Sequence, residues 1–252
     1  MRSRRFYFLV GLLALVICLI PFRAAIWSAA MGLTGMANGR KTISDRVHEF
    51  GEVVHQRLAP RFSQVGVAYP PQQLALVGLK QERKLEVWVA GQDGEFTLLE
   101  TLPILGASGT LGPKLAEGDR QVPEGLYRIE SLNPNSSFHL ALRVNYPNTF
   151  DKAKGKLDGR TNLGSDIMIH GGSASVGCLA MGDQAAEDLF VLAAETGMNN
   201  IDVILSPVDF RTKDVPATQP SLPSWTPELY AQIKEELNRL RSQAPEAARA
   251  QR

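Results

Sequence analysis

Cysteine is nearly absent from this sequence, which contains only two such residues, Cys18 and Cys178. Cys18 lies in an apolar segment at the N-terminus, so the rest of the chain holds a single thiol. If that part is exported, Cys178 has no partner for an intramolecular disulfide. A lone thiol in an oxidising compartment is a liability unless it is deeply buried or has a function. Cys178 is therefore a candidate functional residue.

A charge excess of either sign is also lacking. The chain has 27 basic and 26 acidic residues, a formal net charge of +1, which does not favour nucleic acid or a general anionic partner. No metal-ligand cluster, phosphate-binding loop or dinucleotide fingerprint occurs, so neither a metal nor another cofactor is implied. With 44% hydrophobic and 21% charged residues, the 252 residues fit one sizeable domain with appendages.

The N-terminus has an uncharged apolar run at residues 6–20, preceded by arginines and followed by Pro21. A spanning helix usually needs about 17–25 residues, and a basic start before a shorter apolar core is typical of an export signal. We predict a signal peptide at residues 1–30, cleaved after Ala30, with an uncleaved inner-membrane anchor as the alternative. Because the N-terminal positive charges stay in the cytoplasm, either case predicts a periplasmic body.

Helical spacing of apolar residues predicts a helix near each end of the body. Residues 42–58 form the first helix, which Pro60 should end, within an N-terminal helical segment 31–62. Residues 212–224 contain three prolines and are predicted to be a tether. The C-terminal segment 225–252 should contain a helix opened by Thr226-Pro227, followed by a tail. We expect this helix to dock on the domain because its apolar stripe needs covering.

Short β-like runs separated by turn residues predominate in the central domain, residues 63–211. They lie at 74–79, 84–90, 95–102, 125–132, 138–144, 166–170 and 201–206. This pattern predicts a mainly β (α+β) domain, a β-sandwich or half-open barrel with flanking helices. Residues 146–160 are predicted to be a polar loop, either a solvated flap or a lid. Asp183 is a suitable N-cap for a helix that continues to Thr196 and stops at Gly197.

Residues 167–181 contain the candidate site. An apolar run that is typical of a buried strand leads to His170, small residues follow, and Cys178 comes eight positions after the histidine. A thiolate is the effective nucleophile, and a neighbouring imidazole can take the proton from the thiol. Gly177 leaves room beside the sulfur for backbone N–H groups to bind an oxyanion. The alternative is structural: His170 ends a strand and Cys178 is a small buried hydrophobe.

His170-Gly171, then Ser175-x-Gly177-Cys178 and Met181, resemble the signature of the L,D-transpeptidase catalytic domain (YkuD-type) family. The upstream motifs resemble its YafK-like murein L,D-transpeptidase branch from Gram-negative bacteria. Those motifs begin at Lys80, Gly118, Pro123, Asn133, Phe138 and Tyr146. The resemblance covers roughly residues 65–210. Two features depart from the wider family: the segment between histidine and cysteine is short, and Ala180 stands where an arginine is usual. The resemblance therefore implies the nucleophile but not the family's donor-peptide contacts.

The resemblance implies an enzyme that acts on peptidoglycan stem peptides through a thioester on Cys178, with His170 as general base and acid. It also implies the L,D-transpeptidase-like fold, and that His139, Ser175 and Tyr146 are substrate-binding residues. An amine acceptor would make the chain a transpeptidase. Water would make it an L,D-carboxypeptidase, or an amidase that releases murein-linked lipoprotein. A catalytically inactive murein-binding module is a further alternative. The thiol pKa distinguishes the two: it should be near about 8.5 in an inactive module and well below about 8.5 in an active enzyme.

Overall fold

The computed structural model describes residues 39–216 and 222–243. Contacts divide the chain into residues 1–41 and residues 42–252, and the fold below is that of the second unit. The predicted signal peptide, including Cys18, and part of the predicted tether lie outside the described residues. Among the described residues, no helix combines the length and apolar character needed to cross a membrane.

One mixed sheet organises the described part of the chain. Its nine strands run in the order β3-β2-β1-β9-β5-β6-β7-β8-β4. The strands are β1 (Gln73–Leu79), β2 (Lys84–Ala90), β3 (Phe96–Pro103), β4 (Gly106–Ala107), β5 (Gly125–Ser136), β6 (His139–Val144), β7 (Met168–His170), β8 (Leu179–Ala180) and β9 (Ile201–Ser206). The helices α2 (Ile43–Val65), α3 (Thr149–Leu157), α4 (Asp183–Thr196) and α5 (Thr226–Gln243), with the short η1 (Met198–Asn200), flank it. The predicted α+β class is confirmed.

The long strand β5 joins the two halves of the sheet. Its first residues pair with β9, from Gly125↔Leu205 onward, and its later residues pair with β6, from Ile129↔Val144 onward. The β5–β6 register shifts twice, between Ile129 and Ser131 and again near the hairpin end. Such irregularities bend a strand and increase its twist, which lets one strand serve both halves. The half that contains β6, β7 and β8 carries the candidate site.

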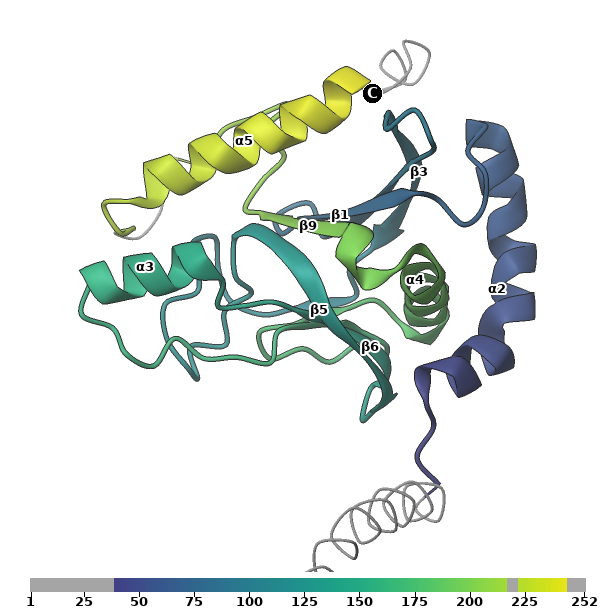
Figure 1. The fold of residues 1–252 in the computed structure, drawn as a ribbon. Helices are drawn as coiled ribbons and strands as arrows, with labels where there is room; N and C mark the ends of the chain where they lie inside the picture. The colour runs from purple at the N-terminus through teal and green to yellow at the C-terminus, as the bar shows by residue number, and fades with distance from the viewer. Residues whose placement is uncertain (1–38, 217–221, 244–252) are drawn as a thin grey trace, which may run out of the picture. The chain divides into compact units, whose positions relative to one another are not determined.

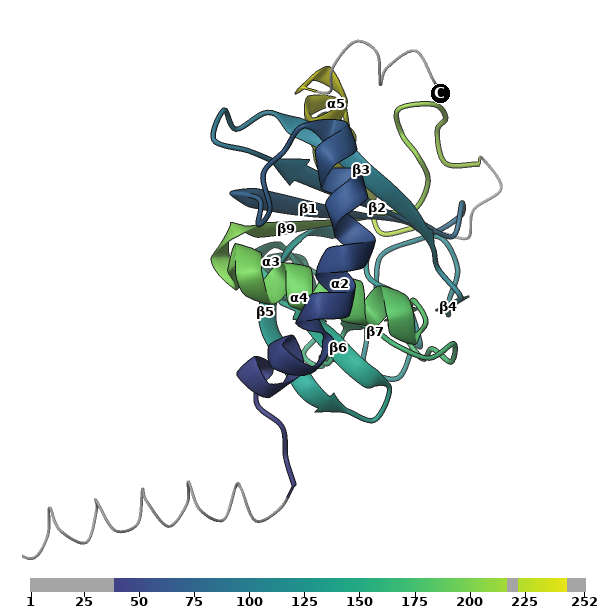
Figure 2. The same cartoon turned by 90° about the vertical axis from the view of Figure 1, so that its right-hand side faces the viewer.

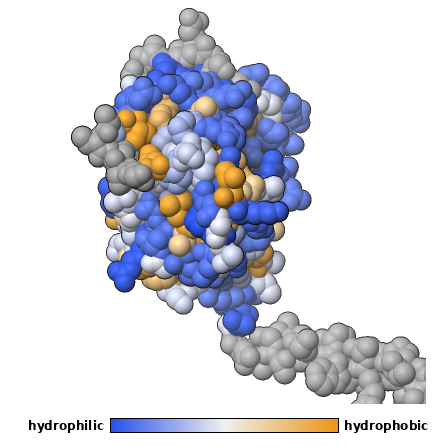
Figure 3. Space-filling view, turned by 90° about the vertical axis from the view of Figure 1, so that its left-hand side faces the viewer, coloured by the Kyte–Doolittle hydropathy of each residue, from blue (hydrophilic) through white to orange (hydrophobic). Residues whose placement is uncertain are grey.

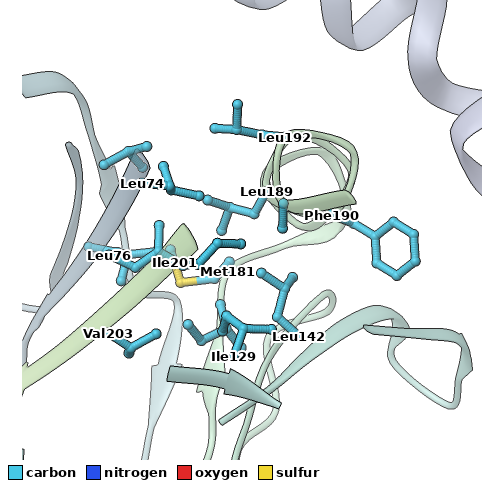
Figure 4. Close-up of a cluster of buried hydrophobic side chains, with 14 of the residues drawn as sticks. Leu74, Leu76, Ile129, Leu142, Met181, Leu189, Phe190, Leu192, Ile201 and Val203 are labelled. Carbon is cyan, nitrogen blue, oxygen red and sulfur yellow. The ribbon is translucent and has the colours of Figure 1, made fainter. Parts of the chain in front are cut away.

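Both faces of the central strands are covered. α2 and α4 lie on one side of the sheet and α5 on the other, as Figures 1 and 2 show. Accordingly β1 and β2 are buried at six consecutive positions each, instead of at alternate ones. Figure 4 shows Leu189 and Leu192 of α4 on the side of the helix that faces strand residues such as Leu74 and Ile201, in one core cluster. A hydrophobic core on both faces fixes the strands that end at the candidate site.

The first helix is longer than predicted. Pro60 lies inside α2, which continues to Val65 and ends at Gly66 in the left-handed conformation (φ 69°). A proline inside a helix removes one backbone hydrogen bond. In α2 the apolar face of the helix continues beyond Pro60: Phe62 is buried in the core, and Val65 packs against the core. This burial compensates for the missing bond, so proline alone did not mark the end of the helix.

Residues 146–160 are not simply a loop, because they contain α3. Asn148 caps this helix: its side chain accepts the Asp151 amide, and the Asp151 carboxylate accepts the Asn148 amide. The helix is short and polar, so it lacks the apolar periodicity by which the other helices were predicted. Figure 3 views the side of the molecule on which α3 lies in Figure 1, and this side is mostly hydrophilic with separate apolar spots. The capping box was the sequence signal that the prediction missed.

The C-terminal helix α5 packs on the sheet as expected. Its apolar stripe is buried, comprising Trp225 just before the helix and Leu229, Ile233, Leu237 and Leu240 within it. Two polar contacts add specificity: Tyr230 donates to the Glu124 carboxylate at 2.8 Å, and Lys154 of α3 contacts Glu228 at 2.6 Å. α5 thereby contacts the glycine-rich segment 106–125, which leads to the candidate site.

Candidate active site

Strand pairing brings the histidine and cysteine segments together. β7 and β8 are parallel neighbours, with Ile169 opposite Leu179 and His170 opposite Ala180. Cys178 immediately precedes β8, so the segment that follows His170 brings the chain back to lie beside β7, the strand that carries the histidine. Two further backbone bonds extend this contact: Met181 N–H to His170 O at 2.8 Å and Gly182 N–H to Gly172 O at 2.9 Å. The segment predicted to carry the site is therefore one connected unit.

The His170 ring is buried and held on two sides. Its side-chain Nδ1 lies 2.7 Å from the Gly171 carbonyl oxygen. A carbonyl oxygen can only accept, so Nδ1 carries a proton, and in the neutral ring Nε2 is then the nitrogen with a free lone pair. The Phe138 ring stacks on the imidazole at a centroid distance of 4.7 Å, while Phe138 itself is 47% exposed. This tautomer is the one that a general base acting through Nε2 requires.

Cys178 is half-buried, and its thiol donates to the backbone carbonyl of Asp166 at 3.6 Å. The hydrogen bond of the Cys178 thiol in the described part of the chain is thus made to Asp166 and not to His170. Burial raises the pKa of the Cys178 thiol and the Asp166 charge adds to this, whereas the Met168 N–H and the Lys114 charge favour the thiolate less strongly. The pKa well below 8.5 expected of an activated thiol is not what this resting geometry gives, because desolvation outweighs the two stabilising groups.

The thiol pKa leads to a testable pH profile. Because burial raises it, alkylation of Cys178 by iodoacetamide should accelerate steadily from pH 6 through about pH 9, with no plateau near neutrality. The rate is measured in a Cys18→Ser background, in which Cys178 is the only thiol. A plateau that begins below about pH 7 would contradict the prediction, because it would reveal a preformed thiolate.

The two amides beside the sulfur face serine hydroxyls. Gly177 N–H donates to Ser108 Oγ at 2.6 Å, and Cys178 N–H donates to Ser175 Oγ at 3.2 Å. Ser175 also donates to the Cys178 carbonyl at 2.6 Å, so it closes the turn that presents the cysteine. Gly177 has φ +89°, which favours glycine, and lies against the Arg120–Gln121 backbone. A charged oxyanion is a stronger acceptor than a neutral hydroxyl, so it can compete for these amides.

The predicted substrate-binding residues His139 and Tyr146 have structural partners. His139 Nε2 lies 3.1 Å from Glu187 Oε1 of α4, and its ring meets the edge of Phe50 of α2. Tyr146 is 4% exposed and donates its hydroxyl to the Leu163 carbonyl at 2.9 Å. These contacts supply an architectural role for both side chains, and their substrate contacts stay predictions.

Several residues near the site were not predicted from the sequence. Segment 106–125 brings Ser108 to the Gly177 amide and buries Lys114, whose ammonium contacts Asp119 at 2.5 Å. Arg120 and Asp166 have left-handed backbones at φ 55° and 59°, a conformation that non-glycine residues adopt chiefly where the surroundings enforce it. The Gly118-Asp119 and Pro123 motifs were the sequence features that could have drawn attention to this segment. No local pattern shows, however, which strand such a loop contacts.

In the described residues, no three histidine, cysteine, aspartate or glutamate side chains come close enough together to hold a metal ion. A cavity of about 440 Å³ lies between β5, β9 and α5, with Tyr127, Arg128, Asp202 and Arg239 in its wall. It includes neither Cys178 nor His170 in its lining, so it is separate from the candidate site.

Known proteins resemble this chain in sequence. The sequence model of the L,D-transpeptidase catalytic domain matches residues 72–204. A protein named "Putative L,D-transpeptidase YafK" from Escherichia coli K12 is 34% identical over 140 residues, which are 54% of this chain and 53% of the relative; its counterpart from strain O157:H7 gives the same values. The chain thus matches about half the length of these curated relatives.

Solved structures give weaker likenesses. The helical cell shape determining protein Pgp2 from Campylobacter jejuni is 22% identical, with a TM-score of 0.45 over 58% of this chain and 50% of that one. Bd1075 from Bdellovibrio bacteriovorus is 20% identical, with a TM-score of 0.40 over 66% and 55%. The assignment rests on the sequence: the matched domain spans more than half of the chain and includes both His170 and Cys178. The chain belongs to the L,D-transpeptidase catalytic domain family, a family of peptidoglycan metabolism.

Proposed function

We propose that this protein is a peptidoglycan-modifying cysteine acyl-transfer enzyme, an L,D-transpeptidase that forms a thioester on Cys178 with murein stem peptides. The observation that carries the proposal is the pairing of β7 with β8, which places an imidazole of defined tautomer beside the cysteine segment. Family membership supplies the substrate class. The residue roles follow from the chemistry of the groups present.

The acylation step begins with a neutral thiol. The sulfur turns from the Asp166 carbonyl toward the substrate, His170 Nε2 takes the thiol proton, and the sulfur attacks the carbonyl carbon of the peptide bond after the diamino acid. A C–S bond forms, and the C–N bond breaks when His170 returns the proton to the leaving amine. Because burial raises the pKa of the resting thiol, the mechanism that we propose uses base catalysis at the moment of attack and no preformed ion pair.

The tetrahedral intermediate needs donors for its oxyanion. The Gly177 and Cys178 amides are the donors that we propose, and each such donor typically contributes about 10²–10³ in rate. In the resting site they bind the hydroxyl oxygens of Ser108 and Ser175. A substrate carbonyl must displace at least the Ser108 hydroxyl, and the exchange becomes more favourable as negative charge develops on that oxygen.

The acceptor that resolves the thioester defines the reaction. An amine of another stem peptide, or a lipoprotein lysine, gives transpeptidation. Water gives L,D-carboxypeptidase activity, or amidase release of murein-linked lipoprotein. We place either reaction in the periplasm, because the apolar run at residues 6–20 is typical of an export signal.

A second candidate function is a murein-binding module without catalysis. The raised thiol pKa and the Asp166–Cys178 hydrogen bond favour this candidate, since both describe an inactive resting thiol. The Nδ1–H group of His170, which bonds the Gly171 carbonyl, favours the enzyme, because it directs Nε2 to the role of general base.

Incubation of the full chain with isolated sacculi tests the proposal. Products are identified by mass spectrometry after digestion of the glycan strands. New cross-links indicate transpeptidation, loss of the terminal D-alanine indicates carboxypeptidase activity, and freed lipoprotein indicates the amidase. Sacculi that bind the protein but remain chemically unchanged would support the murein-binding module instead.

A further inference from the structure

One peptide unit behind His170 is bound at both ends. Its carbonyl, from Gly171, accepts the His170 Nδ1 proton at 2.7 Å. Its N–H, from Gly172, donates to Asp183 Oδ1 at 2.8 Å. The carboxylate of Asp183 and the imidazole of His170 thus face opposite ends of the same amide. No direct contact between the two side chains is needed for one to influence the other.

Asp183 does not serve as the helix cap that its sequence position suggests. It is the first residue of α4, the N-cap is Gly182, and no side-chain capping bond is present there. The carboxylate instead reaches eleven residues back along the chain to the Gly172 amide. Asp183 is thus at the amino end of α4, where the helix dipole attracts negatively charged groups.

The surroundings leave this peptide little freedom. A Cβ at Gly171 would lie 2.6 Å from Asp183 Oδ1 and 2.7 Å from the Phe138 carbonyl oxygen. Gly171 N–H donates to the Leu140 carbonyl at 3.1 Å, and the Gly172 carbonyl accepts Gly182 N–H at 2.9 Å. Backbone bonds therefore hold the residues on either side, while the Asp183 carboxylate holds the amide that faces His170.

We infer that Asp183 is a positioning residue for His170, which orients and polarises the Gly171–Gly172 peptide so that its carbonyl keeps the imidazole proton on Nδ1. A charged acceptor on an amide N–H strengthens the carbonyl of that amide as an acceptor in turn. A stronger carbonyl favours the Nδ1–H tautomer and stabilises the imidazolium that forms during proton transfer. The inference rests on the proposed role of His170 as general base.

Two variants of Asp183 test the inference. Asp183→Ala removes the acceptor, and Asp183→Asn retains an oxygen that can accept the Gly172 N–H without the charge. The tautomer of His170 is read from ¹⁵N shifts of the histidine rings in the full chain, with His170→Gln used for assignment. We expect Nδ1–H in the wild type and in Asp183→Asn, and a substantial Nε2–H population in Asp183→Ala.

Turnover on sacculi gives the second readout. Since Asp183 acts on the base and not on the substrate, Asp183→Ala should lower kcat about 10-fold with KM changed less than about 2-fold, and asparagine should restore most of the loss. Gln184→Ala is the matched control, because Gln184 is exposed on the same turn and its side chain makes no hydrogen bond within the described residues. An unchanged tautomer and kcat in Asp183→Ala would overturn the inference.

The spectra separate the inference from the proposed function. The tautomer is measured without substrate, so a wild-type chain that leaves sacculi unchanged counts against the enzyme, while the ring shifts still decide the role of Asp183. If Asp183→Ala does not fold, exchange of the Gly172 amide proton is compared between wild type and Asp183→Asn. Slow exchange in both supports the inference, and fast exchange in the wild type overturns it.

Discussion

Replacement of Cys178 by alanine is expected to abolish product formation on sacculi, with a loss of at least about 10⁴-fold, because no other group can form the thioester. The single thiol of the described domain lies directly before β8, beside the strand that carries His170. Its removal takes one small side chain from a half-buried position. Folding should therefore be nearly unaffected, and the loss should appear in chemistry alone.

Covalent chemistry can be observed directly in the wild type. Intact-protein mass spectrometry during turnover should show a species heavier by the mass of the donor acyl group, and Cys178→Ala should never show it. His48→Ala is a suitable control, because His48 is an exposed histidine on α2. Retention of product formation by Cys178→Ala would exclude the thioester mechanism, whatever the acceptor.

Local patterns predicted much of the fold. The strand at residues 201–206 has the predicted bounds, and the helix that starts at Thr226-Pro227 packs on the sheet as expected. Alternation, helical periodicity and proline at the first turn are all readable over a few residues. α3 was missed because its sequence lacks an apolar stripe. The length of α2 was underestimated because packing of Phe62 compensates for Pro60.

The residues of the candidate site were predictable in part, for the same reason. His170 and Cys178 stand close in the sequence, so a single motif indicates both. Ser108 reaches the Gly177 amide from 69 residues away, and Asp183 was assigned the local role of N-cap although it bonds across to Gly172. Contacts of this kind depend on how strands pair. They cannot be read from spacing, propensity or capping rules.

A buried ion pair beside the turn between β1 and β2 leads to the largest expected effect on stability. The Lys80 side chain is 6% exposed, and its ammonium lies 2.7 Å from Glu124 Oε1, whose side chain is 0% exposed. The ammonium also donates to the Val122 and Gly112 carbonyls. Burial lowers the pKa of Lys80, and the attraction of Glu124 opposes this. The pair holds the glycine-rich segment that contains Ser108.

Glu124→Ala is expected to lower the free energy of unfolding by about 3–5 kcal/mol, because it leaves a buried ammonium without its counter-charge. It also removes the acceptor for Gly112 N–H and for the Tyr230 hydroxyl of α5. Typical domains are stable by only about 5–15 kcal/mol, so the loss should be evident in the urea midpoint. Lys84→Ala, at an exposed lysine that begins β2, should change stability by less than about 0.5 kcal/mol.

The double variant Lys80→Met/Glu124→Gln separates charge burial from simple loss of contacts. If the penalty comes from an uncompensated charge, removal of both charges should be less destabilising than the sum of the two single changes. Additive losses would instead indicate that water reaches the pair and that each side chain contributes independently. In that case Ser108 would be held near Gly177 by the backbone bonds of its segment, and the Glu124 variants that fold should retain activity on sacculi.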